Sequence, residues 1–166
     1  RHGGANIKVQ EMFDCIKANV GNRKDDGALT DMKLLHYIDA DTDNPVYASD
    51  SDGVLFNADG TVLVQAPTRF ETYVVPEGVT EIGAYAFSGS TKLQAVYFPN
   101  EGVTTIGCNA FAGCIRLDNV ILPDGLTRIE MNVFNRCSAL VEVTIPASVP
   151  EIRDSAFHEC RALKDV

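Results

Sequence analysis

Polar and apolar positions repeat in a fixed rhythm over the second half of the chain. From residue 76 onward, the same residue types return every 23 or 24 positions. A regular period of this length predicts a solenoid, in which each coil buries its apolar side chains against the coils on either side. The series in register are Pro76, Pro99, Pro123 and Pro146; Ile82, Ile106, Ile129 and Ile152; Phe87, Phe111, Phe134 and Phe157; and Leu93, Leu117, Leu140 and Leu163.

Within one repeat, residues 93–99 predict a short β-strand. Val96 and Phe98 alternate with Ala95 and Tyr97, so the first pair is expected to face the core and the second pair the outside. Proline follows because it lacks the N–H that a strand ladder needs. The recurring Ala-Phe pair is expected on a tight helical turn that directs the ring inward. Successive coils then build a right-handed superhelix with a parallel sheet on one side and strands about 4.8 Å apart.

These residues resemble the BspA-type leucine-rich repeat. VPEGVTEIGAYAFSGSTKLQAVYFP, EGVTTIGCNAFAGCIRLDNVILP and GLTRIEMNVFNRCSALVEVTIP follow that family's pattern, IP-x-x-V-x-x-I-x-x-x-AF-x-x-C-x-x-L-x-x-V. The resemblance covers residues 35–166. It departs from the pattern at Ser90 in the usual cysteine position, at Val133 for alanine, and at an extra residue beside Asn100 that turns PEGV into PNEGV.

The resemblance implies an α/β leucine-rich-repeat solenoid, mostly coil with short helical turns opposite the sheet. It also implies a non-catalytic protein-binding or adhesion module of a secreted or cell-surface bacterial protein. The implied partner is a protein, such as a host extracellular-matrix or cell-surface protein. A structural spacer within a larger surface protein is the alternative.

Three parts are expected along the chain. Residues 1–34 form a helical cap region, residues 35–75 a degenerate repeat with an inserted β-hairpin, and residues 76–166 the regular repeats. Apolar side chains at helical spacing over 7–20 predict an amphipathic helix that covers the first coil, with a partner-docking helix as the alternative. A second short helix is expected after Thr30.

The inserted hairpin and the end of the chain complete this division. Residues 53–56 and 61–64 flank a glycine-containing turn at 57–60, which predicts the hairpin. The sequence stops within a fifth strand without a capping repeat. We therefore expect either a piece of a longer solenoid or an open end that associates with a second copy.

Composition and charge narrow the classes of function. The chain is 45% hydrophobic and 22% charged, as is usual for a folded protein. Its 14 basic and 23 acidic residues leave a net charge of −9, with no basic cluster, so nucleic acid is not an expected partner. No apolar run approaches the roughly 20 residues of a membrane-spanning helix, so direct membrane insertion is not expected either.

Three of the five cysteines lie in the repeat series. Cys114, Cys137 and Cys160 are 23 residues apart and occupy one core position in adjacent coils, whereas Cys15 and Cys108 lie outside that series. Buried free thiols are favoured, because cysteine is a small apolar filler. Disulfides between neighbouring coils are the alternative, and zinc is disfavoured because no CxxC spacing occurs.

Four aspartates fall on an EF-hand-like spacing. Asp39, Asp41, Asp43 and Asp50 occupy positions 1, 3, 5 and 12 of such a loop. Asn44 replaces the glycine at position 6, and position 12 is aspartate rather than the bidentate glutamate. A specific calcium site is therefore disfavoured but left open, and no cofactor is expected.

Catalytic motifs are missing from the sequence. No GxSxG elbow, phosphate loop, dinucleotide fingerprint or HExxH occurs. Of His2, His36 and His158, only the last lies beside other reactive groups, in His158-Glu159-Cys160. Because Cys160 belongs to the core series, its thiol should be inert, and the chain is not expected to be an enzyme.

The outward-facing strand positions are the candidate binding site. These positions hold mainly β-branched and aromatic residues, which suit the surface of any sheet. Solenoids also use exposed sheets for recognition, and tyrosine is frequent at protein interfaces. Both explanations stay open at this point. The candidate residues are Val74, Tyr97, Ile121 and Thr144 in one column, and Ala95, Asn119 and Glu142 in the other.

Overall fold

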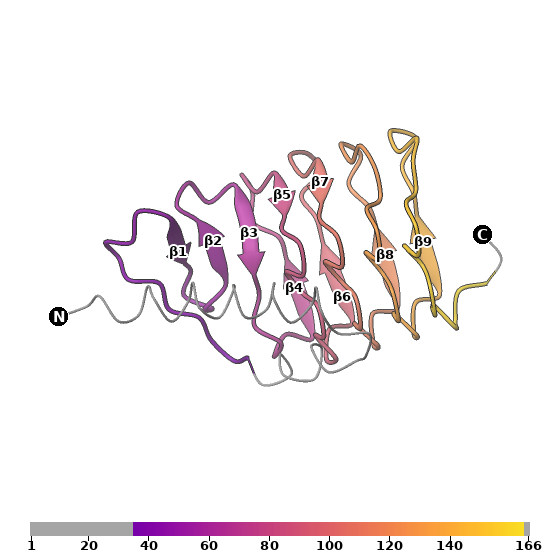
Figure 1. The fold of residues 1–166 in the computed structure, drawn as a ribbon, viewed down its shortest axis with the longest axis horizontal. Coiled ribbons are helices and arrows are strands. Elements are labelled where there is room, and N and C mark those ends of the chain that lie inside the picture. The colour runs from indigo at the N-terminus through magenta and orange to yellow at the C-terminus, as the bar shows by residue number, and fades with distance from the viewer. Residues whose placement is uncertain (1–34, 165–166) are drawn as a thin grey trace.

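The chain winds into stacked coils that carry two rows of short strands (Figure 1). The structure, a computed structural model, describes residues 35–164. The helices predicted over 7–20 and after Thr30 lie outside the described residues. Within residues 35–164 there is no helix, and therefore none that would cross a membrane.

The strands form two sheets. In the first sheet the order is β1 (Tyr47–Ser49), β2 (Leu55–Asn57), β3 (Val62–Gln65), β5 (Glu81–Ile82) and β7 (Thr105–Ile106). In the second sheet the order is β4 (Thr72–Val74), β6 (Ala95–Tyr97), β8 (Asn119–Ile121) and β9 (Glu142–Thr144). The pairs from β3 to β7 and from β4 to β9 are parallel, which confirms the predicted stacking of coils. The coils that carry β5 and β7 thus contribute to two parallel sheets, where one was predicted, and beyond β7 an isolated parallel bridge joins Ile129 to Ile152.

An antiparallel hairpin begins the first sheet. β2 pairs with β3 around a turn in which Gly60 has a φ of 70° and donates its N–H to the Asn57 carbonyl (3.0 Å). The hairpin predicted over 53–64 is therefore present. β1 adds a third antiparallel strand that the sequence did not predict, because its three residues are too few for an alternating pattern. The parallel stack then starts on β3.

A continuous stack of aromatic rings fills the centre of the coils. The rings of Phe87 and Phe111 have centroids 5.1 Å apart, and the next two steps, to Phe134 and to Phe157, are both 5.5 Å. Interplanar angles of 7° to 10° show that equivalent rings lie one above another. Phe87, Phe111 and Phe134 are fully buried. The repeated phenylalanine thus forms the core that the 23–24-residue period predicts.

Away from the strands, each coil turns back through β-turns, and the predicted short helical turns are not confirmed. Alternate amides bond in two directions: Phe87 N–H donates to the Ala110 carbonyl in the next coil (2.8 Å), whereas Ala86 N–H donates to Gly83 in its own coil (3.2 Å). Two positions in each coil have positive φ, which a right-handed helix excludes. These positions are Tyr85 and Gly89, Asn109 and Gly113, Asn132 and Arg136, and Ser155 and Glu159.

Candidate functional site

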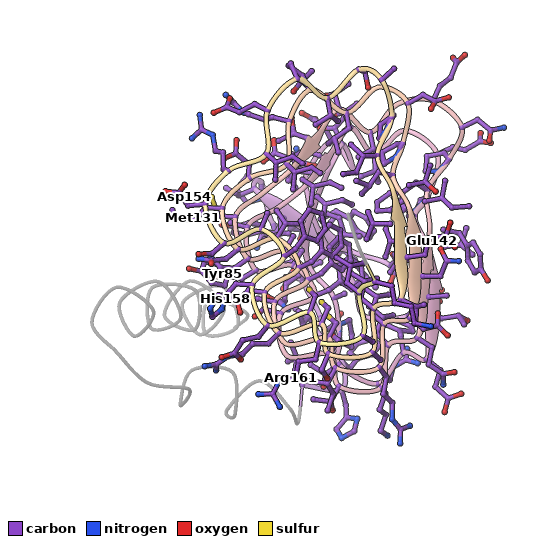
Figure 2. The ribbon with its side chains drawn as sticks, turned by 90° about the vertical axis from the view of Figure 1, so that its right-hand side faces the viewer. Tyr85, Met131, Glu142, Asp154, His158 and Arg161 are labelled. Carbon is purple, nitrogen blue, oxygen red and sulfur yellow. The ribbon has the colours of Figure 1, made fainter. Side chains whose placement is uncertain are left out.

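The first and third residues of each strand lie on the outer face of the second sheet, where all are exposed except the half-buried Ala95. The middle residues Tyr73, Val96 and Val120 are buried, and Val143 is half-buried. Strand register places the predicted residues in two columns, since Val74 pairs with Tyr97 and Ile121 with Thr144. In Figure 2, Glu142 lies on this face, on the opposite side from the turns that carry Tyr85 and His158. All seven predicted residues lie on this one face.

Three large apolar side chains of this face are mostly exposed. Val74 and Ile121 are each 68% exposed, and Tyr97 is 58% exposed. They lie on the neighbouring strands β4, β6 and β8 and form one strip across this face. Scattered apolar residues on a surface need no explanation, but several gathered on one face are typical of an interaction site.

The second sheet opens between β6 and β8. Registered pairing there is limited to Ala95 with Asn119, whereas three consecutive pairs join β4 to β6 and β8 to β9. Val75 N–H donates to the Tyr97 carbonyl (2.9 Å), and Leu122 N–H donates to the Thr144 carbonyl (3.3 Å). Among the described coils, the corresponding bond from Phe98 N–H to the Ile121 carbonyl is missing. The two strands are therefore separated over their last residues.

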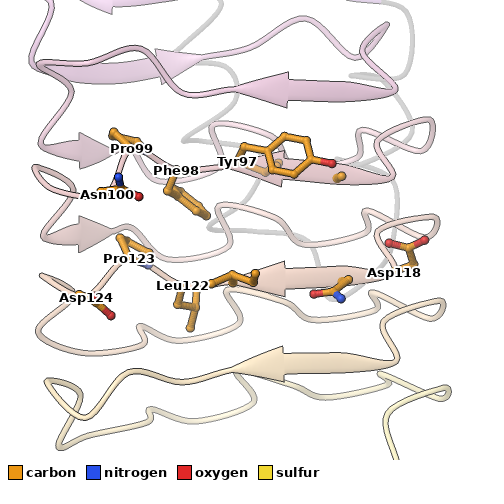
Figure 3. Close-up of a pocket in the computed structure, with 12 residues that line it drawn as sticks. Tyr97, Phe98, Pro99, Asn100, Asp118, Leu122, Pro123 and Asp124 are labelled. Carbon is orange, nitrogen blue, oxygen red and sulfur yellow. The ribbon is translucent and has the colours of Figure 1, made fainter.

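A groove of about 520 Å³ occupies this opening (Figure 3). Its walls are the exposed Tyr97 and Ile121. Its floor includes the buried Val96 and Leu122, together with Phe98, whose ring packs edge-on against Phe111 with centroids 6.4 Å apart. Because Phe98 packs against the aromatic stack, the core fixes the position of the groove floor.

The extra residue beside Asn100 accounts for the opening. In the other regular coils, a turn follows the proline: Val79 donates to Pro76 (3.4 Å), Leu126 to Pro123 (3.0 Å) and Val149 to Pro146 (3.1 Å). The coil that begins at Pro99 has one residue more and lacks this bond. The sequence signal for the groove is therefore the 24-residue interval between Pro99 and Pro123, since the other proline intervals are 23 residues. The repeat pattern alone did not predict that a cavity would form there.

The ends of the groove are acidic. Asp118 directly precedes β8, and Asp124 follows Pro123 at the other end; both are exposed and lie at opposite ends of the cavity in Figure 3. The groove thus combines an apolar middle with a negative charge at each end.

The repeated cysteines are free thiols that bond to the preceding coil. The thiols of Cys114, Cys137 and Cys160 donate to the carbonyls of Phe87 (3.2 Å), Phe111 (3.2 Å) and Phe134 (3.1 Å). Burial raises the pKa of the Cys114 thiol to about 12, and burial likewise raises the pKa of Cys137 and of Cys160. These groups therefore stay protonated near neutral pH and act as structural donors. Cys108 is also free and half-buried, and Cys15 lies outside the described residues.

Ser90 takes the cysteine position in the first regular coil and leaves its hydroxyl without a hydrogen-bond partner. The residue is fully buried. We predict that Ser90→Cys stabilises the fold by about 1 kcal/mol, because burying an unsatisfied hydroxyl costs about 1–3 kcal/mol and a thiol is a weaker polar group. Urea denaturation measures the change. Ser138→Cys is the control, since its hydroxyl is exposed and donates to the Ile115 carbonyl (3.4 Å); an equal gain in both variants would contradict this account.

Two of the four aspartates in the EF-hand-like segment accept backbone hydrogen bonds in turns. Asp41 Oδ1 accepts the N–H of Asp43 (3.0 Å), and Asp50 Oδ1 accepts the N–H groups of Asp52 and Val54 (both 2.9 Å). Within the described range, no three acidic, histidine or cysteine side chains are grouped so as to hold a metal ion. Asp41 and Asp50 thus act as turn-forming residues.

Two members of the His158-Glu159-Cys160 segment make structural contacts with the preceding coil. Glu159 pairs with Arg136 (Oε2 to Nε, 3.0 Å), and the Cys160 thiol is bonded to the Phe134 carbonyl. The carbonyl of His36 accepts the guanidinium of Arg69 (3.1 Å), and His2 lies outside the described residues. These contacts give Glu159 an ion-pair partner and the Cys160 thiol a backbone partner.

Comparisons with known proteins identify the family of the repeats. A model described as "BspA type Leucine rich repeat region" matches residues 66–166 in six copies. No curated protein sequence matches the chain. The chain is 34% identical to the pneumococcal vaccine antigen PcpA, with a TM-score of 0.66, over 70% of this chain and 29% of that one.

Two further structures are similar over most of the chain. A leucine-rich cell surface protein of Faecalibacterium prausnitzii is 29% identical, with a TM-score of 0.50, over 74% of this chain and 37% of that one. The T. pallidum leucine-rich repeat protein is 27% identical, with a TM-score of 0.56, over 75% and 69%. The chain thus spans less than a third of the pneumococcal antigen it resembles. The repeat register, the aromatic stack and the family match agree, and the chain belongs to the BspA-type leucine-rich-repeat family.

Proposed function

We propose that this chain is a non-catalytic recognition module that binds a protein partner through the outer face of the second sheet. Leucine-rich-repeat domains are in general scaffolds for protein interaction. The observation that carries the proposal is the strip of Val74, Tyr97 and Ile121, three large apolar side chains that are more than half exposed on adjacent strands. Tyrosine is enriched in protein-binding hot spots, and the buried centre of an interface is more apolar than its rim.

The mechanism is rigid presentation of side chains. Each exposed residue of the strip neighbours a buried residue of the same strand, so its position is fixed by the core and little ordering is needed on binding. Binding by such a preformed surface involves no catalytic step.

The relatives support a location at a bacterial surface. One is a pneumococcal vaccine antigen, and another is a leucine-rich cell surface protein. We infer that this module acts in a secreted or cell-surface bacterial protein and binds a host extracellular-matrix or cell-surface protein.

The test is binding of surface variants to immobilised extracellular-matrix proteins and cell-surface receptors. We expect Tyr97→Ala and Ile121→Asp each to weaken binding about tenfold or more, as for the centre of an interface. Ile115→Asp and Met131→Ala are matched controls, because these side chains are 47% and 46% exposed but lie outside the second sheet. Surface plasmon resonance gives the affinities, and circular dichroism checks the fold.

Two outcomes would contradict the proposal. If the control variants lose as much affinity as the strip variants, the binding surface lies elsewhere. If the unmodified chain binds none of these proteins, the structural spacer becomes the better account. Concentration-dependent association of the chain alone, measured by sedimentation, would instead favour the predicted end-to-end contact.

A further inference from the structure

We propose that the groove between β6 and β8 binds an extended, positively charged peptide segment of the partner, with a cationic side chain at each end and an apolar side chain between them. This inference rests on the proposed function and specifies the chemistry of the partner. Four observations carry it: the shape of the groove, its length, its charge and the backbone groups that border it.

The shape fits an inserted apolar side chain. Neighbouring strands of a sheet normally lie about 4.8 Å apart and leave no space between them. Here the space is about 520 Å³, within the range of ligand sites, and it lies between the Tyr97 ring and Ile121 with Phe98 below. An aliphatic or aromatic side chain seated there covers apolar surface that is otherwise in water.

The length fits an extended segment. Asp118 and Asp124 are six positions apart on either side of β8. At about 3.3 Å per residue in an extended chain, they are separated by roughly 20 Å. One compact ligand does not reach both carboxylates, whereas an extended peptide with lysine or arginine about six residues apart does.

The charge favours a cationic partner. The 12 residues lining the groove, all of them in the described part of the chain, include Asp118 and Asp124 and neither lysine nor arginine. The nearest basic residue along this strand, Arg116, lies two positions before Asp118 and does not line the groove. The whole chain is also acidic, with a net charge of −9, and therefore repels acidic peptide segments.

The backbone favours a strand-like partner. Phe98 N–H and the Ile121 carbonyl, which would bond to each other in an unbroken ladder, lie on opposite sides of the groove. An extended segment presents the donors and acceptors that such groups pair with, as in recognition by strand addition.

Fluorescence anisotropy with labelled synthetic peptides tests the inference. The probe has a lysine near each end and an apolar valine-isoleucine centre; a second peptide has glutamates in place of the lysines. We expect the lysine peptide alone to bind, and its binding to weaken as salt rises from about 0.1 M to about 1 M. Equal binding of both peptides, or binding unaffected by salt, would overturn the proposal.

Matched charge variants locate the site. Asp118→Asn and Asp124→Asn are each expected to weaken binding of the lysine peptide about two- to fivefold, as for exposed ion pairs. Glu71→Gln and Glu77→Gln are the controls, since these exposed carboxylates occupy the equivalent positions before and after β4 and do not line the groove. Equal losses in the control pair would show a general charge effect and reject the groove.

Deletion of Asn100 tests the origin of the groove. The deletion restores a 23-residue interval, so β6 and β8 should pair fully and binding of the lysine peptide should be lost. Retained binding by a folded deletion variant contradicts the proposal, and if the variant does not fold, the four charge variants decide.

The outcome separates this inference from the proposed function. If the lysine peptide does not bind but Tyr97→Ala still abolishes binding to a matrix protein, the peptide inference fails and the recognition face stands. If instead the chain associates with itself and Asp124→Asn disrupts that association, a second copy is the occupant and the inference is wrong.

Discussion

Phe111→Ala should lower the free energy of unfolding by about 3–5 kcal/mol, the largest effect of any single change considered. The Phe111 ring is fully buried, stacked between Phe87 and Phe134 and in edge contact with Phe98. Backbone ladders on both sides of the ring hold the coils at a fixed spacing, so the neighbouring rings are unable to close the cavity. The cost therefore includes both the lost burial and the cavity itself.

Urea denaturation followed by circular dichroism measures this loss, and thermal unfolding should show a fall of roughly 6–20 °C. Phe157→Ala is the matched control, because that ring is only partly buried and stacks on Phe134 at the end of the aromatic series. Since stability in repeat arrays is nearly a sum over neighbouring units, the end position should cost less. Equal losses of unfolding free energy in the two variants would contradict the expectation that the middle of the stack contributes more stability than its end.

Gly107→Ala should destabilise the protein by about 1–3 kcal/mol, as overpacking of a tight contact does. A Cβ atom at this position would lie 2.6 Å from the Ala84 nitrogen and 2.9 Å from the Ala84 Cα. Both atoms belong to the backbone, which a hydrogen-bonded ladder holds in place. The coils must therefore separate locally to admit a methyl group.

The control for this prediction is Gly125→Ala. There, the nearest atom to an added Cβ is the Val103 carbonyl oxygen at 3.4 Å, close to ordinary contact. Guanidinium or urea denaturation of both variants should show a loss at 107 several times that at 125. A neutral effect of Gly107→Ala would mean that the two coils are not packed as closely as described.

The repeat spacing predicted the core and the outer face, because both follow from periodicity alone. Equivalent phenylalanines must stack when coils of equal length pile up, and alternation within a strand places Tyr97 outside once Val96 is inside. The strand predicted over 93–99 is present but shorter, as β6 (Ala95–Tyr97), and β1 was not predicted. The three-part division of the chain stays a prediction, since the first 34 residues lie outside the described range.

Features that depend on backbone direction were not predicted. The turn that carries Phe87 satisfies its amides alternately within and between coils and needs positive φ at Tyr85, a conformation that residue type alone did not suggest. The hydrogen bonds of the cysteine thiols, and the opening beside Asn100, also depend on where neighbouring coils meet. Periodicity shows which residues are equivalent but not how their backbones pair.

Amide hydrogen exchange of the chain, with and without a matrix protein that it binds, tests the recognition face most directly. The account predicts slower exchange in the bound state for amides of β6 and β8 and for Phe98 and Leu122, with little change at the turns around Tyr85 and Met131. Protection confined to those turns, with β6 and β8 unchanged, would contradict it.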